Sequence, residues 1–407
     1  MGYINVFDGV TGMGFTEVTF LFVFLPVSII IYLVADKVFH KDRLNNSILV
    51  VLSFIFYYWA NKEAMIIVAA IGFFIFIAGQ MVEKKDNEEE SRKKKGRIPI
   101  VFLLGIFLFY KYASFISSLI NNLSSTSLIN IGGLLGPIGL SFIIFESISY
   151  IVDIYRGDAE PGSLLDCFTF LSVFPKIVSG PIVLWKDFKP QLNNRRSTGE
   201  QISIGIDRII VGYAKKAIIA DTFGIQIVLI NSGIAGTGVD VATMWLRAIL
   251  YFFQIYFDFS GYSDIAIGLC SIFGFNIKEN FNYPYLSKSI TEFWRRWHIS
   301  LGSWFREYIY IPLGGNRRGN VYIHLLIVFT LTGLWHGTGL QFVIWGAMHG
   351  ILVVFERLIR NKRWYHIIPD FIKWLFTTAC VLLLWVLFMS KDLPTAFQTY
   401  DNMFTSN

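Results

Sequence analysis

Aromatic and basic residues alternate in the stretch Phe293-Trp-Arg-Arg-Trp-His-Ile-Ser-Leu-Gly-Ser-Trp-Phe-Arg-Glu-Tyr-Ile-Tyr-Ile-Pro-Leu-Gly-Gly-Asn-Arg-Arg318, which contains His298. A second stretch, Leu331-Thr-Gly-Leu-Trp-His-Gly-Thr-Gly339, places His336 in a segment apolar enough to lie in lipid. Histidine is the side chain best suited to moving a proton near neutral pH. An ionisable side chain at membrane depth is a functional candidate. The two histidines are therefore the first candidates for a catalytic site.

The composition is that of a membrane protein. Of the 407 residues, 54% are hydrophobic and 16% are charged, and the mean hydropathy is +0.54. These values exclude a soluble enzyme and predict an all-α, polytopic integral membrane protein. The net charge of +6 fits loops that orient the helices in the bilayer, so we expect the lipid bilayer and no nucleic acid as a partner.

Several apolar runs approach the length of about 20 residues that a membrane-spanning helix needs. They lie at 16–35, 47–60, 64–82, 98–120, 129–150, 202–232, 240–275, 321–357 and 371–390. Basic loops alternate with weakly charged ones between the early runs. By the positive-inside rule, the N-terminus is extracytoplasmic, and 36–46, the charged loop 83–97 and the basic segment Arg357–Arg363 are cytoplasmic. We expect one transmembrane domain over residues 1–407.

The segment Leu164–Pro181 breaks the regular pattern of spans. It is apolar but short, and it contains Pro175, Gly180 and Pro181 between polar, basic-leaning flanks. This pattern favours a re-entrant segment that enters and leaves on the cytoplasmic side. Irregular backbone at membrane depth survives only where protein or a water-filled cavity covers it. The segment therefore indicates a cavity inside the helical bundle.

Residues 290–308 have the periodicity of one amphipathic helix at the membrane interface, ended by Pro312 and Gly314-Gly315. His298 borders its apolar face. The arginines in and after this predicted helix have two open interpretations. Their guanidinium groups either contact lipid phosphates and anchor the helix at the membrane, or bind the phosphates of a cofactor. The candidates for the second role are Arg295, Arg296, Arg306, Arg317 and Arg318.

His336 is the sharper of the two histidine candidates. Gly333, Gly337 and Gly339 surround it within seven residues, which weakens a helix and allows close approach of backbone to a cavity. This environment favours a catalytic histidine over a structural one. Trp297 and Trp335, each next to one of the histidines, are expected to line the cavity.

Two carboxylates, Asp258 and Asp264, lie six residues apart in an apolar run, where they are costly unless paired or wetted. We expect them to line the cavity or to pair with an arginine of the basic stretch; an interfacial helix end is the alternative. Ser141, which follows Pro137 in a kinked run, is a weaker candidate for the cavity wall. The cysteines and histidines are scattered, which predicts neither a disulfide nor a metal site.

Taken together, these motifs resemble the membrane-bound O-acyltransferase (MBOAT) family, nearest to its alginate O-acetyltransferase subgroup. The D-alanyl exporters of teichoic-acid modification form a sister group with related motifs. The segments that carry the resemblance are Pro137–Gly157, Phe174–Pro181, Gly212–Lys216, Tyr256–Asp264, Phe293–Arg318 and Leu334–Gly337.

The resemblance implies an MBOAT-type helical bundle with a central tunnel and a catalytic core over about 130–357. His336 and His298 match the family's two histidines. The chemistry of the residues and the resemblance together favour His336 as general base, with His298 orienting the acceptor or polarising the thioester carbonyl. It also implies acetyl-CoA as donor without a permanently bound cofactor, an extracytoplasmic acetyltransferase partner, a polysaccharide acceptor and the plasma membrane as location. Because the subgroup continues with further apolar helix, we expect either that the sequence is truncated at Asn407 or that the helical bundle is short. Two alternatives are D-alanyl transfer from a carrier protein and a non-enzymatic transporter.

Overall fold

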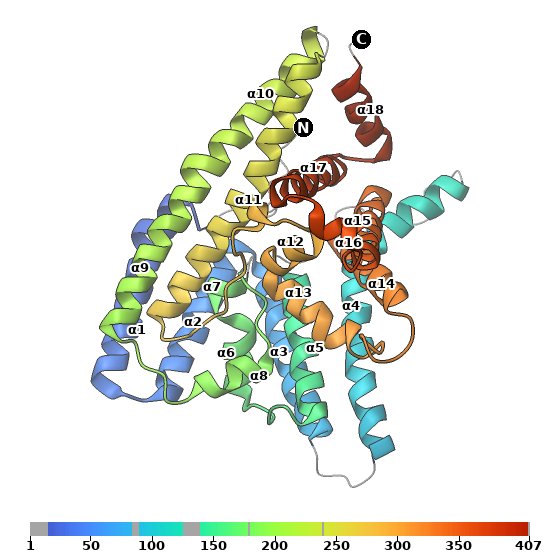
Figure 1. The fold of residues 1–407 in the computed structure, drawn as a ribbon. Helices are drawn as coiled ribbons and strands as arrows, with labels where there is room; N and C mark the ends of the chain where they lie inside the picture. Colours follow the sequence, from blue (N-terminus) through green and yellow to red (C-terminus); the bar gives the residue numbers. More distant parts are fainter. Residues whose placement is uncertain (1–14, 84–88, 125–138, 178–179, 238–239, 406–407) are drawn as a thin grey trace. The chain divides into compact units, whose positions relative to one another are not determined.

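The computed structural model describes residues 15–83, 89–124, 139–177, 180–237 and 240–405, and every regular element in these parts is helical (Figure 1). The all-α prediction is confirmed. The chain divides into two compact units. Among the described residues, the N-terminal unit comprises those up to Tyr213 together with Tyr262–Lys278, and the C-terminal unit comprises Ala214–Gly261 and those from Glu279 onward. The single domain over 1–407 stays a prediction.

In the N-terminal unit, α3 is central, because it packs against α2, α4, α5 and α6. α4 begins within the charged segment 83–97, so residues 89–97 are helical and not the expected loop; Glu, Lys and Arg are good helix formers. The helices are α1 (Leu25–Phe39), α2 (Asp42–Ala60), α3 (Lys62–Val82), α4 (Glu89–Ser124), α5 (Leu140–Arg156), α6 (Leu164–Ser172), α7 (Phe174–Ile177), α8 (Trp185–Phe188) and α9 (Gly199–Tyr213).

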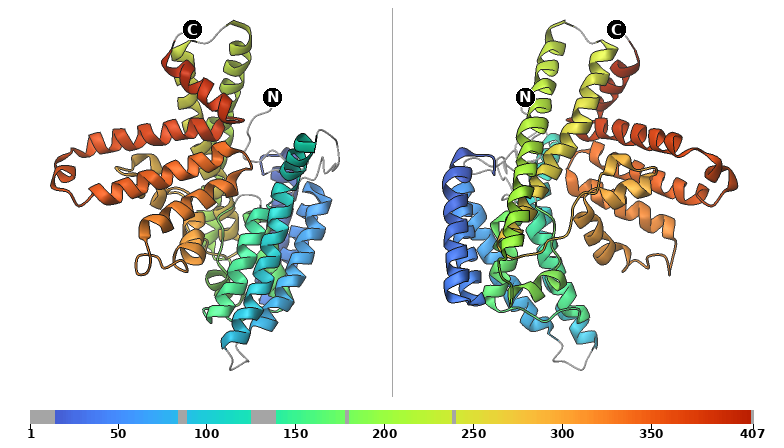
Figure 2. Two further views of the ribbon diagram at one scale, coloured as in Figure 1. Left: turned by 90° about the vertical axis from the view of Figure 1, so that its right-hand side faces the viewer. Right: turned by 60° about the vertical axis from the view of Figure 1, so that its left-hand side comes forward.

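In the C-terminal unit, α15 packs against α12, α14, α17 and α18. Figure 2 shows α14, α15 and α17 side by side in orange and red. The helices are α10 (Asp221–Thr237), α11 (Val241–Ile272, which continues into the N-terminal unit), α12 (Ile290–Arg296), α13 (Ile299–Phe305), α14 (Val321–His336), α15 (Leu340–Ile359), α16 (Arg363–Ile367), α17 (Asp370–Met389) and α18 (Leu393–Phe404).

Five helical segments among the described residues are long and apolar enough to cross a membrane. They are Phe20–Phe39, Met65–Val82, Lys95–Asn121, Leu340–Ile359 and Asp370–Met389. Four of them fall on apolar runs expected as spans at 16–35, 64–82, 98–120 and 371–390. The fifth shows that the long run 321–357 is two helices, because α14 ends at His336 and α15 begins at Leu340.

The segment expected to be re-entrant forms the short helices α6 and α7, which are separated at Val173. Lys176 of α7 is buried and forms an ion pair with Glu146 of α5, so this segment is fixed to the helix that also carries Ser141. Val178 and Ser179, like Pro137, lie outside the described residues. The re-entrant course and the central tunnel stay predictions.

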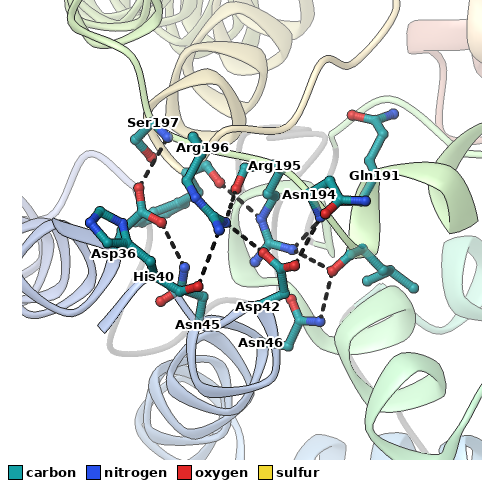
Figure 3. A network of polar contacts seen from close by, with 12 residues as sticks. Asp36, His40, Asp42, Asn45, Asn46, Gln191, Asn194, Arg195, Arg196 and Ser197 are labelled. Carbon is teal, nitrogen blue, oxygen red and sulfur yellow. Dashed lines mark hydrogen bonds and ion pairs between the residues drawn. The ribbon is translucent and has the colours of Figure 1, made fainter. Parts of the chain in front are cut away.

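A polar network holds the α1–α2 corner against the segment that precedes α9 (Figure 3). Asp36 is buried, and its carboxylate accepts hydrogen bonds from Asn45 Nδ2 (2.8 Å) and from the backbone N–H of Ser197 (3.1 Å). Arg195 is also buried; its Nε donates to the backbone oxygen of Phe273 at 3.2 Å. Buried charges are tolerated because they are hydrogen-bonded in this way. The network therefore ties α1, α2 and the end of α11 together within the N-terminal unit.

The prediction of one helix over 290–308 is wrong. α12 ends at Arg296, and His298 adopts the left-handed conformation (φ 45°, ψ 53°) before α13 begins at Ile299. The peptide groups at the break pair with a neighbouring segment: Asn282 N–H donates to Arg296 O, and Ile299 N–H donates to Asn280 O, both at 2.9 Å. A tertiary contact thus overrides the helical periodicity of the sequence.

Two glycines allow α14 and α15 to approach closely. A Cβ atom at Gly346 would lie 2.3 Å from the backbone oxygen of Phe329, and one at Gly333 would lie 2.2 Å from that of Phe342. Real Cβ atoms do not approach backbone so closely. Small residues at such crossings are typical of helix packing in membranes. The close approach sets the position of His336 at the end of α14.

We therefore expect Gly346→Val to destabilise the protein by about 1–3 kcal/mol, because the added side chain forces the α14–α15 pair apart. The measurement is thermal unfolding of the purified protein in detergent. Gly105→Val is the matched control, because nothing lies within 4 Å of a Cβ atom at this helical glycine of α4. Equal melting temperatures for the two variants would contradict the expected tight crossing.

Candidate active site

The imidazole of His298 is oriented by a hydrogen bond to one oxygen atom, Asn280 Oδ1. The imidazole is buried, with 2% exposure, and its Nδ1 lies 3.1 Å from Asn280 Oδ1. The same oxygen accepts hydrogen bonds from the backbone N–H of Ser300 (3.2 Å) and from Ser300 Oγ (2.8 Å). A backbone N–H can only donate, so the Asn280 atom must be the carbonyl oxygen. The proton of a neutral His298 therefore sits on Nδ1, and Nε2 carries the free lone pair.

The Nε2 atom of His298 is buried and has no hydrogen-bond partner among the described residues. Burial also lowers the pKa of the imidazole to about 3, because a charged ring would lose its hydration. At neutral pH the ring is consequently uncharged. A neutral imidazole whose second nitrogen is unoccupied can accept a proton.

His298 lines a cavity of about 380 Å³ in the C-terminal unit. Its volume falls within the range of small-molecule pockets. α12, α13, α14 and α15 form the walls, which are mostly apolar. The lining residues are Thr291, Trp294, Arg295, His298, Ile299, Leu301, Gly302, Ser303, Phe305, Arg306, Tyr310, Asn316, Leu325, Val328, Phe329, Thr332, Val353 and Arg357. We call this the catalytic cavity.

Three arginines line the catalytic cavity: Arg295, Arg306 and Arg357. Arg357 is oriented by Asn316, whose Oδ1 accepts hydrogen bonds from Arg357 Nη2 (3.1 Å) and from Tyr310 Oη (2.8 Å). Guanidinium groups bind phosphates through paired N–H donors. The cavity thus combines an apolar interior with three guanidinium groups, a side-chain type suited to phosphate.

His336 is the last residue of α14, one helical turn beyond Thr332, which lines the catalytic cavity. Residues four apart share a helix face, so His336 lies on the same face of α14 as Thr332, although His336 is not itself a lining residue. The ring of Trp335 contacts both histidines: its centroid lies 6.3 Å from that of His298 and 4.6 Å from that of His336. The structure therefore brings His298 and His336 to one indole.

Aromatic rings enclose His336 on its other sides. Its ring centroid lies 5.2 Å from that of Trp345 and 5.0 Å from that of Phe388, both in edge-to-face geometry. Trp297 is buried in the adjoining aromatic core, with its ring centroid 5.0 Å from that of Trp385. Its role in lining the cavity stays a prediction. The aromatic contacts limit the orientations available to the half-buried His336.

Both carboxylates singled out in the sequence are in ion pairs. Asp258 lies 2.8 Å from Lys216 Nζ, which also contacts Asp221 at 2.6 Å. Asp264 accepts from both Nε and Nη2 of Arg208, at 3.0 and 2.8 Å. These pairs explain how α11 carries two acids in an apolar helix. The bases come from α9 and the π-helical turn that follows it, not from the basic stretch after residue 293.

The remaining arginine candidates differ in their surroundings. Arg296 pairs with Glu292 at 2.7 Å and donates to the backbone oxygen of Asn282. Arg317 and Arg318 are exposed in the turn after α13. Ser141 is half-buried near the start of α5 in the N-terminal unit. Among the residues described, no three His, Cys, Asp or Glu side chains form a group that could hold a metal ion.

The sequence did not single out Asn280, Arg357, Trp345 or Phe388. Asn280 lies in a polar loop, and Arg357 is one of several bases in a segment predicted to be cytoplasmic. Its place in the cavity wall can be recognised only when the pairing of α14 with α15 is known. The role of Asn280 can be recognised only in the structure, where its oxygens pair with His298 and Ile299 at the break between α12 and α13.

Comparison with known proteins identifies the class to which this fold and cavity belong. Residues 143–390 match the model of the MBOAT, membrane-bound O-acyltransferase family. The chain belongs to this family, and it is a multi-pass membrane acyltransferase.

Three relatives indicate where in the family the chain lies. It is 39% identical to a protein of Pseudomonas putida described as "probable alginate O-acetylase AlgI", over 97% of this chain and 80% of the relative. It is 34% identical to a peptidoglycan O-acetyltransferase of Helicobacter pylori, over 76% and 63%. It is 30% identical to a teichoic acid D-alanyltransferase of Bacillus subtilis, over 57% and 62%.

The hydrogen bond from His298 to Asn280 gives a prediction for acyl transfer. Asn280→Ala should lower kcat by about 10- to 100-fold with little change in the KM of the donor, because Nδ1 loses the acceptor that fixes its proton. Asn280→Asp keeps an oxygen for both His298 and Ser300 but adds a negative charge, which raises the pKa of the imidazole.

The Asp variant should therefore be active near neutral pH and lose activity as the pH falls through the raised pKa, where His298 becomes protonated and cannot accept a proton. The measurement is the pH dependence of kcat for the wild-type protein and both variants. A merely structural Asn280 would lower the amount of folded protein without changing the pH profile, and that result would refute the assignment.

Proposed function

We propose that this chain transfers an acetyl group from cytoplasmic acetyl-CoA toward the O-acetylation of an extracytoplasmic polysaccharide. Support comes from the relatives: the protein described as an alginate O-acetylase matches nearly the whole chain, and the one described as a D-alanyltransferase matches 57% of it at lower identity. An extracytoplasmic acetyltransferase partner that completes the transfer, a plasma-membrane location and an extracytoplasmic N-terminus belong to the same proposal.

The observation that carries the proposal is the unoccupied Nε2 of His298 in a cavity with three arginines. Arg295, Arg306 and Arg357 would bind the phosphates of the donor, and the apolar interior would take its pantetheine arm and thioester. The thioester carbonyl then comes within reach of the acceptor hydroxyl that is hydrogen-bonded to a histidine. Positioning of this kind accounts for a large part of enzymatic rate enhancement.

The tautomer of His298 decides its role. Because Nε2 carries no proton, His298 cannot donate a hydrogen bond to the thioester carbonyl and acts as the proton acceptor in the cavity. It takes the proton of the attacking hydroxyl as the new C–O bond forms. The C–S bond breaks, and the resulting imidazolium returns the proton to the leaving thiolate. His336, which contacts the same Trp335 indole, positions the incoming acceptor or relays its proton, in place of the general-base role expected from the sequence.

We expect His298→Ala and His336→Ala each to lower acetyl transfer by at least about 100-fold, the contribution typical of a general base. The assay follows radiolabelled acetyl from acetyl-CoA in proteoliposomes that contain the polysaccharide and its partner. His366→Ala is the control, because His366 is exposed in α16 and does not line the catalytic cavity. Full activity of correctly inserted His298→Ala would end this mechanism.

The arginines of the cavity should set the affinity for the donor. Arg295→Ala, Arg306→Ala and Arg357→Ala should each raise the KM for acetyl-CoA about tenfold, because a charge-assisted hydrogen bond to phosphate is lost. Arg296→Ala is the neighbouring control: its guanidinium pairs with Glu292 and does not line the cavity. If all four variants change the KM equally, the arginines act only through the general field of the basic stretch.

The second candidate is D-alanyl transfer from a carrier protein, which the relative in Bacillus subtilis favours. The cavity distinguishes the two donors chemically. Coenzyme A carries three phosphates, and a carrier-bound phosphopantetheine carries one, so three arginines fit the coenzyme better. Transfer of label from a D-alanyl carrier protein, but not from acetyl-CoA, would favour the alternative. A transporter without chemistry is not retained, because the family is one of acyltransferases.

A further inference from the structure

A second cavity, of about 260 Å³, lies in the C-terminal unit between α15, α16, α17 and the start of α12. Its walls are almost entirely apolar, and charged side chains occur at its edge. The lining residues are Lys288, Ser289, Ile290, Leu352, Phe355, Glu356, Ile359, Trp364, Tyr365, Ile368, Ile372, Lys373, Phe376 and Thr377. We call it the lateral cavity.

The lateral cavity lies where lipid is expected. α15 and α17, which form two of its walls, are both candidate membrane spans. Its lining side chains Phe355, Ile372 and Phe376 are 50–55% exposed, so they face outward from the C-terminal unit as well as inward. Trp364 and Tyr365 also line the cavity, and these two residue types are enriched at the membrane–water interface.

Positive charge is concentrated in the part of the chain next to Trp364 and Tyr365. The segment from Glu356 to Lys373 contains five basic side chains and two carboxylates. Both carboxylates have partners: Glu356 accepts from the backbone N–H of Thr291 at 3.0 Å, and Asp370 pairs with Lys288 at 2.7 Å. The bases Arg360 and Lys362 are exposed in the short connection between α15 and α16, and Arg363 is exposed at the start of α16. An anionic group beside the cavity would meet this uncompensated charge.

We propose that the lateral cavity binds an anionic phospholipid, with one acyl chain in the apolar interior and the phosphate against the basic connection at 360–363. An apolar slot between two spans with a basic rim on the side predicted to be cytoplasmic is the arrangement that recognises such lipids. The acyl chain of a zwitterionic lipid would fill the lateral cavity equally well, but its headgroup would gain little electrostatic attraction from the basic connection. Charge therefore distinguishes the preferred occupant.

The helices α12 and α15 form a wall between the two cavities. On α12, Ile290 lines the lateral cavity and Thr291 lines the catalytic cavity; on α15, Glu356 and Arg357 divide in the same way. The hydrogen bond from Thr291 N–H to Glu356 joins the two helices at this point. A bound acyl chain would support α12, which has only seven residues and cannot be stable by itself. Lipid binding should therefore stabilise the catalytic cavity, independently of which acyl group is transferred.

The test is native mass spectrometry of the detergent-purified chain titrated with phosphatidylglycerol or phosphatidylcholine. We expect phosphatidylglycerol to bind at least about tenfold more tightly and to raise the melting temperature more. The combined substitution Arg360→Glu, Lys362→Glu and Arg363→Glu should remove this preference. Lys41→Glu with Arg43→Glu is the charge control, because these exposed bases lie in another loop predicted to be cytoplasmic. Equal affinity for the two lipids in the wild-type protein would overturn the proposal.

A second pair of variants tests the slot itself. Ile372→Trp fills the lateral cavity and should lower phosphatidylglycerol binding about tenfold, whereas Leu375→Trp makes the same change on the same helix outside the lining. Both positions are 52% exposed, so their effects on folding should be similar. If the two variants bind phosphatidylglycerol equally, whether as tightly as the wild-type protein or more weakly, the lipid does not occupy this cavity and the proposal is wrong.

Discussion

The acceptance of three donors by Asn280 Oδ1 is the interaction on which the candidate active site depends. The Ser300 backbone N–H identifies that atom as oxygen, and the oxygen in turn places the proton of His298 on Nδ1. With Nδ1 occupied and buried, Nε2 is the only atom of the ring that can act in the catalytic cavity. The chemistry of His298 is thus decided outside the cavity, by a residue that does not line it.

The same contact accounts for the break between α12 and α13. A left-handed backbone at a residue other than glycine costs about 1–2 kcal/mol, and His298 would not adopt it in a continuous helix. Hydrogen bonds from Asn282 N–H to Arg296 and from Ile299 N–H to Asn280 offset this cost, because they satisfy backbone groups that the break would leave unpaired. The break turns the imidazole out of the helical register and lets α12 and α13 form adjacent walls of one cavity.

The sequence predicted what depends on local pattern and composition. The length of the apolar runs predicted the spans near α1, α3, α4 and α17. The residues around His298 and His336 in the sequence identified these two histidines as candidates. The course of residues 290–308 could not be predicted in this way, because their apolar periodicity is intact and the break is imposed by a segment that precedes them. Arg357 was hidden for a related reason: only the crossing of α14 and α15 at Gly333 and Gly346 brings it to the cavity.

Charged side chains that form ion pairs stabilise the fold, whereas the charged side chains on the cavity wall remain available for ligands. Asp258 and Asp264 are each balanced by a nearby base, so that breaking either pair would leave a charge in an apolar helix. Arg295 and Arg306 are instead exposed on the wall of the catalytic cavity, where hydration sustains their charge until a ligand replaces it. Donor binding can therefore use these guanidinium groups without weakening the helix packing, and changes in the paired carboxylates should alter folding before they alter chemistry.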